Sequence, residues 1–103
     1  MYQISFYAPK NNVEPVKSAM FKAGAGKINN YARCAWQTEG VGQFIPTQGA
    51  KPIIGALNQL EVLPEVKIEM VCDDDHIDQV VKAMKASHPY EEVAYSIVKL
   101  ENK

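Results

Sequence analysis

The sequence predicts an α+β protein with a ferredoxin-like βαββαβ sandwich, in which two helices cover one face of an antiparallel sheet. The first observation is an internal repeat: a strand-like segment followed by a helix-like segment occurs twice, so that Ile4 corresponds to Ile68 and Met20 to Met84. The second is that a further strand-like segment follows each of these units. The third is a length of 103 residues with 47% hydrophobic residues, which predicts one domain, residues 1–103, with a core of its own.

The first unit begins with a strand over residues 2–7, because apolar and polar side chains alternate there. Asn11 and Asn12 are residues that cap helix N-termini, and Gly24 is typical of the position just after a helix. Between them, apolar residues follow at helical spacing. These residues are Val13, Val16, Ala19, Met20 and Ala23. We expect a strand over residues 31–38 to complete the unit.

The second unit repeats this pattern, with Ile68 and Met70 in a strand and three aspartates, residues 73–75, at the start of a helix. The apolar face of that helix comprises Ile77, Val80, Ala83 and Met84. We expect the last strand to cover residues 93–100.

Residues 40–64 are additional to the minimal fold and form a structured insertion. They predict a short strand at residues 43–45, a loop rich in glycine and proline, and a strand near residues 60–63. We expect Pro64 to separate this last strand from the longer run over residues 66–72. A structured insertion in so small a domain is typical of a segment that binds a ligand or a partner.

The composition excludes several classes of protein. A formal net charge of −1, with 11 basic and 12 acidic residues spread along the chain, gives no footprint for a nucleic acid or an anionic membrane. No apolar run approaches the roughly 20 residues that span a bilayer, and no signal-peptide pattern is present. Cys34 and Cys72 have no metal-ligand spacing and suggest reduced thiols, so we expect a cytoplasmic protein.

The motif His88-Pro89-Tyr90-Glu91-Glu92, between the second helix and the last strand, is the strongest candidate for chemistry. The imidazole can ligate a metal ion or transfer protons, and the carboxylates could supply oxygen ligands. If the strand begins at Glu91, the two carboxylates point to opposite faces and only one can act with His88. The alternative is a structural helix end, since a cation suits the last carbonyls and Pro89 stops the helix.

Other candidates have structural explanations. The aspartates at 73–75 with His76 are explained by capping and by the helix dipole. Gly24 and Gly26 follow a helix and so do not form a dinucleotide fingerprint. Trp36, the single tryptophan, is expected in the core or at an interface. No zincin, P-loop or triad pattern appears, and no catalytic residue is assigned.

Several motifs in register resemble one known domain. They are Gly24-x-Gly26-x-Ile28, Tyr31-x-x-Cys34, Gly40-x-Gly42-x-Phe44-x-Pro46, Gly49-Ala50-x-Pro52-x-Ile54-Gly55, Glu65-x-x-Ile68-Glu69 and the motif at 88–92. Together they resemble the middle domain of YqfO-type proteins of the NGG-interacting-factor-three-like family, over almost the whole chain. That domain is similar to the PII and CutA proteins; CutA has a similar His-Pro-Tyr and forms trimers by sheet-to-sheet packing. The sequence departs from the pattern at Asn29, where glycine is usual, and at Val93, near which a proline is usual.

The resemblance implies a stand-alone PII/CutA-like domain that acts as a small ligand-binding or regulatory and assembly module. It implies a homo-oligomer, a trimer in preference to a dimer, with ligands in clefts between subunits. The residues that it places at such a site are Tyr31, Cys34, Phe44, Pro46, Gly49, Pro52, Gly55, His88, Tyr90 and Glu92. The metal-binding residues of that family belong to flanking domains with no counterpart in this sequence, so no cyclohydrolase-type activity is carried over.

The alternative function is a metal-handling protein or enzyme that uses His88 with Glu91 or Glu92. A divalent metal ion is the candidate cofactor, and small molecules or metal ions are the candidate ligands. Of the two, the residues favour a binding module over an enzyme.

Overall fold

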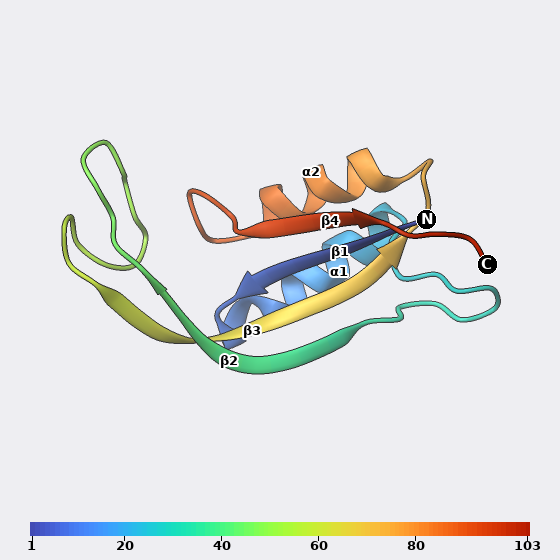
Figure 1. Cartoon of the computed structure of the whole chain (residues 1–103), viewed down its shortest axis with the longest axis horizontal. Helices are drawn as coiled ribbons and strands as arrows, with labels where there is room; N and C mark the ends of the chain where they lie inside the picture. The colour runs from blue at the N-terminus through green and yellow to red at the C-terminus, as the bar shows by residue number, and fades with distance from the viewer.

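The computed structural model describes residues 1–103 and contains one antiparallel sheet with two helices on one of its faces (Figure 1). The elements are β1 (Tyr2–Ala8), the 3-10 helix η1 (Lys10–Asn12), α1 (Val13–Ala23), β2 (Trp36–Phe44), β3 (Glu61–Cys72), α2 (Ile77–Ser87) and β4 (Tyr95–Lys99). The strand order is β2-β3-β1-β4, so β2 and β4 are the edges. The predicted α+β class and ferredoxin-like sandwich are confirmed.

The core lies between the sheet and the two helices. Alternate residues of β1 and β3 point toward the helices, which is why Ile4, Phe6, Ile68 and Met70 are all buried. The helices contribute Val16 and Met20 from α1 and Val80 and Met84 from α2, the same positions that the internal repeat relates. Neither helix combines the length and apolar character that crossing a membrane requires.

Helix α1 ends as the sequence predicts. Gly24 has a φ of +120°, and its N–H bonds to the carbonyls of Met20 and Phe21. A side chain at this position would also collide with the ring of His76, 2.6 Å from the position of a Cβ. Both constraints require glycine.

The strand predicted at residues 31–38 is wrong in its first half. Residues 31–35 are irregular: Ile28 and Tyr31 form an isolated bridge, and Arg33 has a φ of +57°. Strand β2 instead begins at Trp36, which is 68% exposed and therefore not part of the core. The separate short strand predicted at residues 43–45 is the end of this same β2.

Pro64 does not interrupt a strand, contrary to the prediction. Strand β3 runs without a break through residues 61–72, and Pro64 lies opposite Val41 of β2. Strand β1 pairs with β3 only as far as Ala8 opposite Val66, so the outer part of β3 has a single neighbour. A proline is tolerated there because the opposite edge has no ladder bond to lose.

The outer half of the β2–β3 hairpin therefore extends beyond the rest of the sheet. We call residues 40–65 the arm: they comprise the outer parts of β2 and β3 and the loop between them, which projects from one end of the body (Figure 1). The arm gives the molecule its elongated dimensions of 46 × 25 × 25 Å. The two chain termini lie at the other end, where the N–H of Leu100 bonds to the carbonyl of Met1.

Strand β4 is shorter than predicted. It covers residues 95–99, and Glu91 and Glu92 belong to a bend that precedes it. The expectation that their carboxylates point to opposite faces of a strand is therefore wrong, because neither residue is in a strand.

Candidate functional site

The motif at 88–92 forms the turn between α2 and β4. Helix α2 ends at Ser87, and His88 is its C-cap with extended backbone angles, φ −81° and ψ 141°. Pro89 lacks an N–H and disfavours helical geometry for the residue before it, so the chain leaves the helix at His88. The turn brings Tyr90, Glu91 and Glu92 over the base of the arm.

His88 holds this turn to the sheet. Its side chain is buried, with 7% of the residue exposed. Nε2–H donates to the carbonyl of Tyr7 at 2.6 Å, and Nδ1 accepts from the N–H of Tyr90 at 3.1 Å. Both ring nitrogens thus have protein partners, which assigns the proton to Nε2 and leaves neither nitrogen facing a ligand.

Tyr90 links the turn to the arm. Its hydroxyl donates to Glu65 Oε2 at 2.8 Å, and its ring lies 4.9 Å from the ring centroid of His88 and 6.4 Å from that of Phe44. Partial burial, and then the hydrogen bond to Glu65 and its negative charge, raise the pKa of the Tyr90 phenol. The phenol therefore remains a neutral hydrogen-bond donor.

A cavity of about 300 Å³ lies where the arm meets this turn. The arm lines it with Gln43, Phe44, Pro46, Ala50, Pro52, Ile53, Ile54 and Glu65, and the turn lines it with Tyr90, Glu91, Glu92 and Ala94. Tyr7 of β1 completes the wall. We call this space the arm cavity.

Five of the predicted ligand-binding residues line the arm cavity: Phe44, Pro46, Pro52, Tyr90 and Glu92. Gly55, with a φ of +96°, lies beside it, since a Cβ there would be 3.5 Å from Phe44 and 3.6 Å from Pro46. His88 lies behind Tyr90 and outside the wall. Gly49 is in open space within the arm loop.

Tyr31 and Cys34 are not part of this site. They belong to the loop between α1 and β2, at the opposite end of the molecule from the arm (Figure 1). Tyr31 is 75% exposed, whereas Cys34 is half-buried and its N–H bonds to the carbonyl of Gly26.

The structure does not gather His88, Glu91 and Glu92 into a group of metal ligands, and no other group of three or more such side chains could hold a metal ion. Glu91 instead accepts a bond from the N–H of Lys51 at 3.0 Å, which ties the turn to the arm loop.

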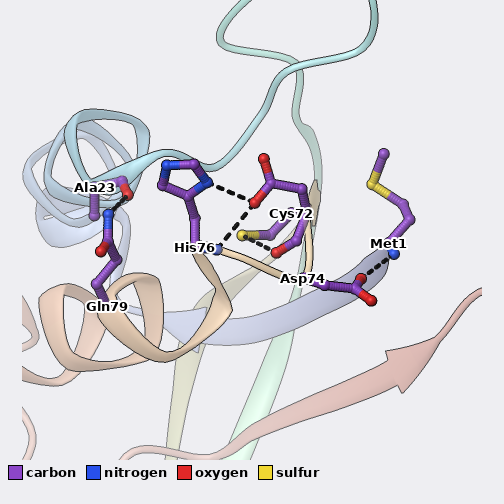
Figure 2. Close-up of polar contacts among 7 residues, drawn as sticks. Met1, Ala23, Cys72, Asp74, His76 and Gln79 are labelled. Atoms are coloured by element: carbon purple, nitrogen blue, oxygen red, sulfur yellow. Dashed lines mark hydrogen bonds and ion pairs between the residues drawn. The ribbon is translucent and has the colours of Figure 1, made fainter.

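Two of the three aspartates before α2, Asp73 and Asp74, make structural contacts (Figure 2). Asp73 Oδ1 accepts from the N–H of His76 at 2.9 Å and from its Nδ1–H at 2.6 Å. These bonds lower the pKa of Asp73, and a contact with the N-terminal ammonium lowers the pKa of Asp74. Burial, reinforced by the charge of Asp73, raises the pKa of the Cys72 thiol to about 11, so this thiol is unreactive near neutral pH.

A second cavity, of about 480 Å³, lies beside α1 and the loop that follows it. Its charged side chains are all basic: Lys22, Lys27 and Arg33. None of the residues of the motif at 88–92 lines it. The two cavities thus differ in the sign of their charge as well as in their position.

The sequence does not single out Tyr7 or the side chain of Glu65 as parts of a site. One signal in it is indirect: Gly42 lies opposite Leu63 on β3, and a Cβ at Gly42 would be 1.7 Å from Glu65 Oε1. A strand glycine without a positive φ indicates that another group passes close to the backbone. Here that group is the Glu65 carboxylate, which is held by Tyr90.

No protein-family model matches the chain. Over 99 residues the chain is 46% identical to a Bacillus subtilis protein named GTP cyclohydrolase 1 type 2 homolog, and the match covers 96% of this chain and 26% of that protein. The chain therefore spans about a quarter of the length of the curated relatives that it matches.

Two solved structures superimpose on this fold. A Bacillus cereus protein related to NIF3 superimposes with a TM-score of 0.85 at 39% identity, over 98% of this chain and 26% of that one. CutA1 from Pyrococcus horikoshii superimposes with a TM-score of 0.73 at 16% identity, over 100% of this chain and 86% of that one. The second similarity shows the fold alone.

Proposed function

Because the chain matches one segment of NIF3-related proteins and has the CutA-like fold, we propose that it is a small ligand-binding module that acts as a homo-oligomer. The observation that carries the proposal is the arm. None of its residues from 40 to 65 belongs to the buried core cluster, so the arm is not needed to build that core. It nevertheless lines a cavity with the motif at 88–92.

Exposed apolar side chains support assembly through the arm. Val41 is 75% exposed, and five further large apolar residues of the arm are exposed: Ile45, Ile53, Leu57, Leu60 and Val62. Exposed aliphatic side chains that are gathered on one projecting segment are typical of a surface that a partner covers.

The sheet edges support the same proposal. Edge strand β2 begins with the exposed Trp36, and edge strand β4 is exposed along its whole length. The outer edge of such a strand has unpaired backbone donors and acceptors that can bond to another chain. A trimer is the arrangement that the resemblance to CutA implies, and free thiols at Cys34 and Cys72 suit the cytoplasm.

Native mass spectrometry of the purified protein at micromolar concentration tests the assembly. We expect a homo-oligomer, with the trimer as the main species. The double variant Val41→Lys and Val62→Lys should shift the distribution to monomer, because two charges would have to be buried at the interface.

The variant Ala86→Lys is the control, since Ala86 is an exposed position of α2 outside the arm. It adds the same kind of side chain and should leave the distribution unchanged. A wild-type protein that is monomeric under these conditions would contradict the proposal.

A further inference from the structure

The wall of the arm cavity combines an apolar surface with negative charge. Phe44, Pro52 and Ile54 supply aromatic and aliphatic surface, whereas the charged residues of the wall are three glutamates, Glu65, Glu91 and Glu92. No lysine or arginine lines the cavity. A ligand that is complementary to this wall has an apolar body and a positive charge.

None of the three glutamates has a cationic partner. Glu65 accepts from the neutral hydroxyl of Tyr90, and Glu91 accepts from the backbone N–H of Lys51. The salt bridges of the molecule involve none of the three carboxylates. Each bond orients a carboxylate without supplying a positive charge to pair with it.

The same groups disfavour anions. A phosphate or carboxylate that entered the cavity would meet three like charges and no cationic side chain, and like charges in a partly desolvated site are strongly unfavourable. A nucleotide is therefore a poor match for this cavity, whereas an ammonium group can donate hydrogen bonds to the carboxylates and lie against the aromatic faces.

From this complementarity we propose that the arm cavity binds a small organic cation, a primary amine with a compact aromatic or branched apolar body. The apolar body lies against Phe44, Pro52 and Ile54, and the ammonium group faces the acidic part of the wall, which Glu65, Glu91 and Glu92 supply. The bond between Glu91 and Lys51 holds the loop over the cavity. This inference rests on the proposal that the protein is a ligand-binding module and names the ligand class.

A titration followed by NMR of the backbone amides tests the inference, with three probes of the same shape: benzylammonium, benzyl alcohol and benzoate. We expect benzylammonium to shift the amide signals of Ile53 and Glu92. It should bind about tenfold more tightly than benzyl alcohol, because charge-assisted hydrogen bonds are stronger than neutral ones. Benzoate should bind more weakly than the alcohol.

Charge-neutral variants separate electrostatics from shape. Glu92→Gln replaces an exposed carboxylate by an amide of the same size, so it should fold normally and weaken benzylammonium about threefold to fivefold. It should leave the affinity for benzyl alcohol unchanged. Glu101→Gln, near the C-terminus and away from the cavity, should change neither affinity.

Equal binding of the three probes, tighter binding of benzoate, or no binding of benzylammonium up to about 10 mM would each overturn the inference. The inference would also be overturned if Mg²⁺ alone shifted the same amides and bound more tightly than benzylammonium. Native mass spectrometry of the same sample keeps the two proposals apart, because the assembly can fail or succeed whichever probe binds.

Discussion

At the scale of single residues, His88 shows how a candidate for chemistry becomes part of the architecture. Its position at the end of a helix, directly before a proline in the sequence, is consistent with a structural role or with a metal ligand. The structure adds two hydrogen bonds, one to β1 and one within the turn, that use both ring nitrogens. His88 therefore positions Tyr90, which itself lines the arm cavity.

Replacing His88 by alanine should destabilise the protein substantially. His88→Ala leaves the Tyr7 carbonyl and the Tyr90 N–H without their partners and opens a void behind the turn, so we expect the free energy of unfolding to fall by about 3 kcal/mol. Urea denaturation followed by circular dichroism measures this change.

The matched control is His76→Ala. His76 is partly exposed and its ring bonds only to Asp73, so its removal should cost less than about 1 kcal/mol. Equal losses for the two variants would show that His88 does not hold the turn to the sheet.

The ionisation of Tyr90 makes the free energy of unfolding depend on pH in the alkaline range. Its pKa is raised in the folded state, and that of an unfolded tyrosine is about 10. Between the two values the unfolded chain loses the proton while the folded protein keeps it, so the free energy of unfolding falls as the pH rises above about 10.

Tyr90→Phe should remove this contribution, and its free energy of unfolding should fall less steeply than that of the wild type between about pH 9 and 11.5. Cys72, whose pKa is raised to about 11, adds a decrease of the same sign that is common to both proteins. Tyr31→Phe, at an exposed site outside the arm cavity, should retain the wild-type dependence. Identical pH curves for Tyr90→Phe and the wild type would contradict the assignment.

At the scale of elements, the arm is an extension of the sheet and not a separate insert. Strands β2 and β3 pair continuously from Trp36 opposite Glu69 to Phe44 opposite Glu61. The loop beyond them is closed by a bond from the N–H of Asn58 to the carbonyl of Pro46, at 2.6 Å. The loop and the body are therefore separable in principle.

Replacing residues 47–58 by Asn-Gly tests this separation. A two-residue hairpin turn would then join Pro46 to Gln59 in the register in which Phe44 pairs with Glu61, and Asn-Gly is a favoured sequence for such a turn. We expect a melting temperature within about 5 °C of the wild type, because the core cluster is untouched. Binding of benzylammonium should be lost, because the cavity residues Ala50, Pro52, Ile53 and Ile54 are removed.

The control keeps the loop and changes two exposed side chains outside the cavity, Thr47→Ala with Gln48→Ala. It should bind the probe as the wild type does. An excised protein that fails to fold would show that the arm loop stabilises the body.

At the scale of the whole molecule, the sheet, its edges and the two cavities define different regions. The helices cover one face of the sheet, and the arm, which carries exposed apolar side chains, projects at the end remote from the termini (Figure 1). The acidic cavity lies at the base of the arm and the basic cavity beside α1. A net charge of −1 conceals this separation, because opposite local charges cancel in the sum.

Local patterns in the sequence determine the two strand–helix units, the C-terminal cap of α1 at Gly24 and the residues of the core. Each depends on the spacing of side chains within one element, which the order of residues specifies directly. For the same reason the predicted strand at 31–38 and the break at Pro64 are wrong: whether a segment pairs, and along which edge, depends on its neighbours in the sheet. The predicted N-cap of α1 is not confirmed, because Asn12 precedes the helix but its side chain makes no capping bond.

The candidate site could be predicted in part. The arm and the turn at 88–92 each stand out through their glycines, prolines and clustered polar residues, and five residues of the predicted set do line one cavity. The assignment of Tyr31 and Cys34 to the same site follows from the resemblance, whereas the loop between α1 and β2, to which they belong, lies at the other end of the molecule from the arm (Figure 1).

What only the tertiary structure decided is the set of bonds that join distant segments. Tyr7 meets His88 across 81 positions, Lys51 meets Glu91 across 40, and Glu65 meets Tyr90 across 25. No local periodicity encodes such pairs. They form because β1 and β3 are neighbours in the sheet and α2 returns the chain to their shared end, where the arm and the turn enclose the cavity.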